Sequence, residues 1–114
     1  MAVNRGTPDH RIYAQWHFRT RARERLGILL SRHELRAIAG ELACASWRNG
    51  CRIFNRDRMW FFFPVRGVFC WVLFDPGMRR VVTCLAEAPD YFSVEETAYY
   101  ENRGRMAFEK ESRK

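Results

Sequence analysis

The sequence lacks several features that would place it in a well-marked class of protein. Its four cysteines form no C-x-x-C pair, which argues against a zinc site, and no cofactor motif is present. The apolar runs between Met59 and Phe74 are interrupted by Arg66-Gly67, so none approaches the roughly 20 residues of a membrane-spanning helix. Residues 1–11 are polar and charged, unlike a secretory signal. We therefore expect a reduced, cytoplasmic protein with no cofactor and no membrane segment.

Common catalytic signatures are missing as well. The chain has no Gly-rich phosphate loop, no H-E-x-x-H helix, no G-x-S-x-G turn and no conspicuous pair of carboxylates. These absences leave phosphate-loop NTP hydrolysis, zinc proteolysis and serine hydrolysis without support.

Lysine is nearly absent, since only Lys110 and Lys114 are lysines among the 20 Lys+Arg residues. The formal net charge is +7, and it arises before Met59: residues 1–58 carry 12 Arg against 5 acids, whereas residues 59–114 carry 8 Lys+Arg against 8 acids. A surplus confined to one half indicates a polyanionic partner, with nucleic acid first and an acidic protein surface second. Arginine favours specific phosphate contacts, because its planar fork grips phosphate with two bonds. A GC-rich genome would produce the same bias with no function attached.

Periodicity and turn signals predict an α+β domain. We expect helices over about 12–26, 32–45 and 93–111, and strands over about 51–56, 59–65, 68–74 and 80–85. Gly27 should end the first helix, and capping boxes should begin the other two at Ser31 and Ser93. Because the links between strands are short, the sheet should be an antiparallel meander. We expect two N-terminal helices packed on a four-stranded antiparallel meander with a C-terminal helix, divided into a disordered lead (1–11), a single domain (12–92) and the last helix (93–114).

Both faces of the predicted sheet are apolar. Alternation places Trp60 and Phe62 on one face and Met59, Phe61 and Phe63 on the other. The two N-terminal helices should cover one face. The other needs the C-terminal helix, a second copy or protein partner docked on its aromatic residues, or nucleic-acid bases stacked on them.

The stretch from His17 to Arg25 reads H-F-R-T-R-A-R-E-R and holds four arginines and a histidine. As a helix it carries an apolar ridge of Ala14, Phe18, Ala22 and Leu26. A second ridge consists of His17, Arg21 and Arg25, and Arg19 and Arg23 lie on the other side. Arg25 falls near the centre of the apolar face, so its guanidinium should reach a pocket and needs an acid, a carbonyl or a phosphate there. The alternative is a solvated basic face in an arginine-biased proteome.

Two motifs together resemble a known family. His17, Arg21 and Arg25 before Gly27-Ile28 form a helical H-x-x-x-R-x-x-x-R signature, and the segment 81–85 is a final apolar strand that contains a threonine. Over about residues 12–86 this pattern resembles the barnase, colicin D and RelE type of small ribonuclease fold. Leu26, between Arg25 and Gly27, departs from it.

The resemblance implies metal-independent RNA cleavage. His17 would transfer protons, Arg21 and Arg25 would bind the scissile phosphate, and Thr83 would hold a phosphate oxygen. Further candidates for contacts to the nucleic-acid backbone are Arg19, Arg23 and Arg66.

The leading hypothesis is therefore a small basic RNA-binding protein with a ribonuclease-like, toxin-like activity. The alternative is a non-catalytic inhibitor from a phage or mobile element, of the anti-defence or anti-CRISPR kind, that binds a nucleoprotein complex or an acidic protein surface. An enzyme should be toxic when expressed and should lose its toxicity on His17→Ala, whereas an inhibitor should be harmless and should copurify with a partner.

Overall fold

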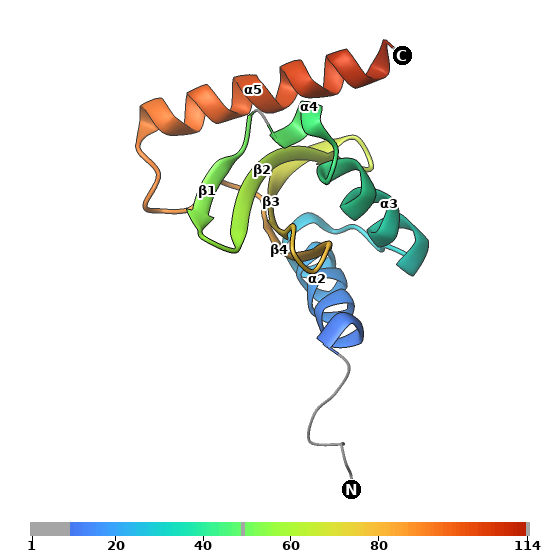
Figure 1. Ribbon diagram of the computed structural model, residues 1–114. Coiled ribbons are helices and arrows are strands. Elements are labelled where there is room, and N and C mark those ends of the chain that lie inside the picture. The colour runs from blue at the N-terminus through green and yellow to red at the C-terminus, as the bar shows by residue number, and fades with distance from the viewer. Residues whose placement is uncertain (1–9, 49, 114) are drawn as a thin grey trace, which may run out of the picture.

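Helices precede and follow a four-stranded antiparallel sheet (Figure 1), which confirms the predicted α+β class. The computed structural model describes residues 10–48 and 50–113, and for residues 10–15, 45 and 46 it describes the backbone alone. The helices are α2 (His10–Leu26), α3 (Arg32–Leu42), α4 (Ala45–Arg48) and α5 (Val94–Ser112). The strands are β1 (Arg52–Asn55), β2 (Arg58–Val65), β3 (Val68–Asp75) and β4 (Arg80–Leu85). Of the expected lead, residues 1–9 lie outside the described ranges, and His10 and Arg11 belong to α2.

The strands follow one another in the sheet in the order β1-β2-β3-β4, all antiparallel, so the meander is confirmed. β1 pairs only with the first part of β2, up to Trp60, and β2 therefore has an open edge farther along. Pro64 lies in that unpaired part, where a residue without an N–H leaves no ladder bond unmade. β4 forms the opposite edge of the sheet.

The expected helix ends are present. Gly27 adopts φ 69°, a left-handed conformation that glycine reaches without strain, and its N–H donates to the Arg23 carbonyl at 3.1 Å. Ser31 and Ser93 both form complete capping boxes with the glutamate three residues on. None of the helices in residues 10–48 and 50–113 is long and apolar enough to cross a membrane.

The second helix is shorter than predicted. It ends at Leu42 instead of continuing to residue 45, and the chain then forms the short helix α4. The break has a packing reason: it turns the Trp47 side chain, only 2% exposed, into the core, where its ring centroid lies 4.7 Å from that of Phe63. The local sequence pattern favours a straight continuation of α3, but the free energy gained by burying the large Trp47 side chain outweighs that preference.

One face of the sheet packs against the N-terminal helices, as predicted. Phe18 and Ala22 of α2 and Leu35, Ile38 and Leu42 of α3 join a single buried cluster with the strands. The strand residues of this cluster are Met59, Phe61, Phe63, Val65, Cys70, Val72, Phe74, Val81 and Cys84. Burial raises the pKa of the Cys70 thiol to about 12 and that of Cys84 to about 11, so both behave as small apolar side chains.

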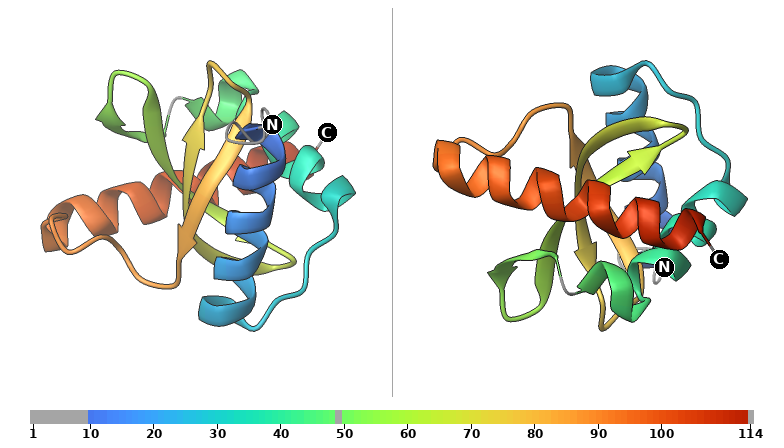
Figure 2. Two further views of the ribbon diagram at one scale, coloured as in Figure 1. Left: turned by 90° about the horizontal axis from the view of Figure 1, so that it is seen from below. Right: turned by 90° about the horizontal axis from the view of Figure 1, so that it is seen from above.

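The other face is covered by α5 and by the link that leads to it, and α5 crosses the strands steeply (Figure 2). Its buried residues are Trp60, Phe62, Trp71 and Leu73, with Phe92 from the link. The core interpretation of these aromatic residues is therefore confirmed. They are not accessible to a second copy, a protein partner or nucleic-acid bases, because α5 already occupies the face.

Gly104 sets the distance between α5 and β2. A glycine inside a helix ordinarily weakens it, but a Cβ at this position would overlap the Phe62 carbonyl oxygen and lie 2.8 Å from the Phe62 Cβ. Arg105 beside it places its guanidinium 5.2 Å from the Phe62 ring centroid and 5.0 Å from that of Phe69. The glycine permits a close approach that any larger residue would prevent.

Phe18→Ala should destabilise the fold by about 3–5 kcal/mol, because Phe18 is fully buried between α2 and the sheet. Chemical denaturation followed by circular dichroism would measure the loss. An unchanged unfolding midpoint would mean that α2 does not pack on this face.

Gly104→Ala should destabilise by about 1–3 kcal/mol, since the helix must move away from β2 to admit the methyl group. Gly40→Ala is the matched control. Gly40 also lies in a helix, nothing surrounds its added Cβ within 4 Å, and the substitution should stabilise by about 0.5–1 kcal/mol. Equal effects of the two substitutions in thermal denaturation would contradict the close approach.

Candidate nucleic-acid interface

Helix α2 lies along the edge strand β4 (Figure 2). Phe18 and Ala22 are both fully buried beneath it, and they fix the rotation of the helix about its axis. At 3.6 residues per turn this rotation puts Arg21 on one flank and Arg23 on the other. The burial of Phe18 and Ala22 therefore explains the predicted division of the basic residues between two flanks of α2.

The structure brings Arg25 and Thr83 together although they lie 58 positions apart in the sequence. The Arg25 Nη1 donates to the Cys84 carbonyl at 2.8 Å and makes a longer contact of 3.5 Å with the Thr83 hydroxyl. Of the three partners expected for this guanidinium (an acid, a carbonyl or a phosphate), the structure shows a carbonyl, that of Cys84 in the edge strand. Arg25 is nevertheless exposed, so it lies across the surface of β4 and not in a pocket beneath the helix. Its guanidinium has five N–H donors, and the hydrogen bond to the Cys84 carbonyl holds this planar group at the edge of the sheet.

His17 stands near Arg21 and Arg25 on the same flank. Partial burial lowers its pKa below the usual 6.5, the positive charges of the two arginines lower it further, and the nearby Glu24 carboxylate raises it. A pKa below 6.5 keeps most of the imidazole neutral at pH 7. We call His17, Arg21 and Arg25 of α2, together with Thr83 of the adjacent strand β4, the α2 ridge.

Arg66 does not lie with the α2 ridge. It sits at the β2–β3 turn with φ 51° and forms a bidentate ion pair with Glu34, Nε to Oε2 at 2.6 Å and Nη2 to Oε1 at 2.8 Å. This pairing, together with the hydrogen bond from the Ser31 N–H, lowers the pKa of Glu34 to about 2. The ion pair links the β2–β3 hairpin to the first turn of α3, so Arg66 has a structural role. Its predicted contact with the nucleic-acid backbone stays a prediction.

Arg19 and Arg23 border a groove of about 350 Å³ that sequence reasoning did not anticipate. Trp16 and Thr20 of α2 share its wall, and Leu29 and Leu30 come from the link to α3. The Arg19 Nε donates to the Leu30 carbonyl at 2.7 Å. The helical spacing of the α2 residues could have predicted that they share one face of the helix. The position of Leu29 and Leu30 opposite them depends on how the link folds.

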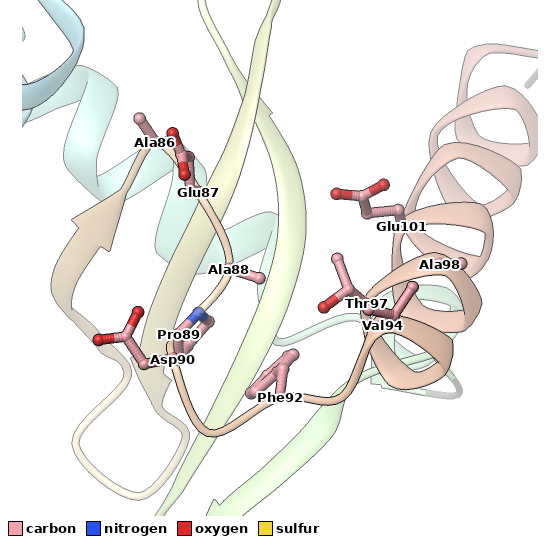
Figure 3. A pocket seen from close by; sticks show the side chains of 10 residues that line it. All are labelled: Ala86, Glu87, Ala88, Pro89, Asp90, Phe92, Val94, Thr97, Ala98 and Glu101. Atoms are coloured by element: carbon pink, nitrogen blue, oxygen red, sulfur yellow. The ribbon is translucent and has the colours of Figure 1, made fainter.

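A second cavity, of about 560 Å³, lies between the 86–92 link and the start of α5 (Figure 3). Small and apolar residues such as Ala88 and Phe92 line it, and its carboxylates are Glu87, Asp90 and Glu101. Negative charge excludes this cavity as a phosphate site. The groove beside Arg19 and Arg23 carries the opposite charge.

Among residues 10–48 and 50–113, no three histidine, cysteine or acidic side chains gather in a way that could hold a metal ion. In comparisons with protein-family models, with curated proteins and with solved structures, the chain shows no match. The resemblance to small ribonucleases thus rests on the motifs of the sequence, and the roles it implies stay predictions.

The His17 pKa should lie below 6.5 in an NMR titration of the folded protein. Arg21→Ala and Arg25→Ala should each raise it, and Glu24→Gln should lower it, since the charge of each group acts on the imidazole in that sense. Because the unfolded chain takes up the proton first, the contribution of His17 to stability is complete above pH 6.5 and is lost as the pH falls through the folded-state pKa. Arg23→Ala, on the other flank, should leave the titration unchanged. Equal shifts from all three arginine substitutions would mean that the ridge is not a local cluster.

Proposed function

We propose that this chain binds RNA through the α2 ridge. The observation that carries the proposal is the contact of Arg25 with the Cys84 carbonyl, which holds an arginine fork beside the Thr83 hydroxyl and within electrostatic reach of His17. Cations and a hydroxyl fixed at one place suit a phosphate group. The charge surplus of residues 1–58 adds a general attraction to any polyanion.

RNA is favoured over an acidic protein surface for two reasons. An acidic partner needs only positive charge, whereas the α2 ridge adds a neutral imidazole and a hydroxyl to its arginines. These are the groups that phosphodiester chemistry uses. The resemblance to small ribonucleases points the same way.

The same geometry fits metal-independent cleavage. A neutral His17 would accept the proton of the 2′-hydroxyl, whose oxygen then attacks the adjacent phosphorus. The new 2′-O–P bond forms as the P–O5′ bond breaks, leaving a 2′,3′-cyclic phosphate and a 5′-oxygen that takes its proton from water. Arg21 and Arg25 would neutralise the charge that builds on the phosphoryl oxygens.

Single-stranded RNA should bind at low salt and dissociate as salt rises, because each neutralised phosphate releases counterions. Arg21→Ala should weaken binding roughly tenfold or more, as expected for a lost charge-assisted contact. The control is Arg36→Ala, which removes the same charge from the exposed side of α3 and should have a small effect. Glu24→Gln should tighten binding, since it removes the carboxylate paired with Arg21 at 2.7 Å. Fluorescence anisotropy of a labelled oligonucleotide measures all four proteins.

Arg25→Ala also removes the Cys84 contact, so its stability must be measured beside its affinity. Arg25→Lys keeps the charge and should not restore binding, because an ammonium lacks the planar two-bond fork. Equal losses for Arg21→Ala and Arg36→Ala would leave only a diffuse basic surface.

Cleavage is decided by His17→Ala. Loss of a 2′,3′-cyclic phosphate product with binding retained would establish the base, and a purified protein that binds RNA without product would limit the function to binding. No binding even at low salt would overturn the proposal and favour a non-catalytic inhibitor that holds an acidic partner.

A further inference from the structure

The flank of α2 opposite the α2 ridge carries the groove bordered by Arg19 and Arg23, which we call the Trp16 groove. Trp16, Arg19, Thr20 and Arg23 occupy positions i, i+3, i+4 and i+7, so they share one face of the helix. Leu29 and Leu30 face them from the link that follows Gly27. The groove thus combines one aromatic ring, two cations, a hydroxyl and an apolar side.

The two walls of the groove are fixed to each other. The left-handed Gly27 turns the chain at the end of α2, and the Arg19 Nε holds the Leu30 carbonyl at 2.7 Å. Leu30 itself is buried, only 4% exposed, so the link is anchored in the core. Leu29 points outward and is 66% exposed. The groove is therefore built by the fold and does not depend on one mobile side chain.

Trp16 differs from the other three tryptophans of the chain. It is 60% exposed, whereas Trp47, Trp60 and Trp71 are 2%, 5% and 1% exposed. A large apolar ring beside two arginines offers a surface to a ligand that is flat and apolar on its face and anionic at its edge. A nucleotide with an unpaired base has this chemistry, and base–aromatic stacking beside cations is the way proteins hold single strands.

We propose that the Trp16 groove binds one unpaired nucleotide of a single-stranded RNA. The base stacks on the indole of Trp16, and the adjoining phosphate contacts Arg23 and the Thr20 hydroxyl. The inference rests on the proposed RNA binding and deepens it, because it specifies that the protein selects single-stranded over double-stranded RNA. A volume of about 350 Å³ is within the range of small-ligand sites.

The position of the groove allows one strand to contact both flanks of α2. A helix with its side chains is about 10–12 Å across, so a flexible strand can cross its outer side from Trp16 to the α2 ridge. Glu24 lies on this path, and its charge is offset by Arg21 at 2.7 Å. A duplex cannot follow the same path with a base in the groove, because its bases are paired and stacked.

Tryptophan fluorescence reports on the groove directly, since only one of the four indoles is largely exposed. Titration of the full chain with an eight-nucleotide oligouridylate at low salt should quench the emission of Trp16. An abasic oligonucleotide of the same length keeps the phosphates but offers no ring, and a duplex of the same length hides its bases. Both should bind with little quenching.

Affinities of the variants complete the test. Trp16→Ala should weaken oligouridylate binding by about tenfold or more and should not change abasic binding, whereas Trp16→Phe should retain most of the affinity. Tyr99→Ala, which removes a 54% exposed ring from α5, is the control and should have no effect. Thermal denaturation of each variant shows that the fold is intact.

The outcomes separate the two proposals. RNA binding that depends on Arg21 but shows neither quenching nor a Trp16→Ala effect would overturn the Trp16 groove and leave the α2 ridge standing. Absence of any RNA binding at low salt would overturn both. Quenching by an acidic peptide in place of the oligonucleotide would assign the groove to a protein partner and also contradict the inference.

Discussion

The burial of Phe18 and Ala22 against the sheet is the constraint on which the rest of the molecule depends. Both side chains are fully buried, and they determine which residues of α2 face solvent on each flank. Arg25 reaches the edge strand β4 only because α2 lies along that strand with this rotation. The Trp16 groove depends on the same rotation, since its four helical residues occupy the opposite flank. One packing contact therefore places both proposed parts of the RNA surface.

The arginines of this chain differ in the groups that they contact. Arg66 pairs with Glu34, and Arg52 pairs with Glu96 at 3.0 Å while its guanidinium lies 4.4 Å from the Phe92 ring centroid. These arginines join elements of the fold. In α2, Arg19 and Arg25 donate to carbonyls, and Arg21 pairs with Glu24 of the same helix. An arginine-rich composition by itself could not distinguish these roles, because the distinction depends on which acids lie nearby in space.

Much of the fold could be predicted from the sequence because its signals are local. Ser31 and Ser93 lie three residues before a glutamate, Gly27 follows the last helical turn, and alternation assigns the residues of β2 and β3 to the two faces of the sheet. Where packing at a distance decides, prediction failed. The break after Leu42 depends on where Trp47 can be buried, and the role of Gly104 depends on the carbonyl of Phe62.

The candidate site shows the same division. The spacing of His17, Arg21 and Arg25 placed them on one flank. The partner of Arg25 was predicted to be an acid, a carbonyl or a phosphate in a pocket, and it is the Cys84 carbonyl at the exposed sheet edge. Proximity of Thr83 to Arg25 came only from the resemblance, and the structure places the two side chains in contact. The Trp16 groove could not be found from α2 alone, since Leu29 and Leu30 reach it through the turn at Gly27.

The most direct test of the account is a map of backbone amide chemical shifts in the labelled protein as single-stranded RNA is added. An RNA surface on α2 should move the amides of residues 16–25, of the link 27–30 and of Thr83 and Cys84, and should leave the acidic cavity around Glu87 and Glu101 unchanged. Shifts centred on the acidic cavity or on α5, or shifts spread evenly over every exposed arginine, would contradict it.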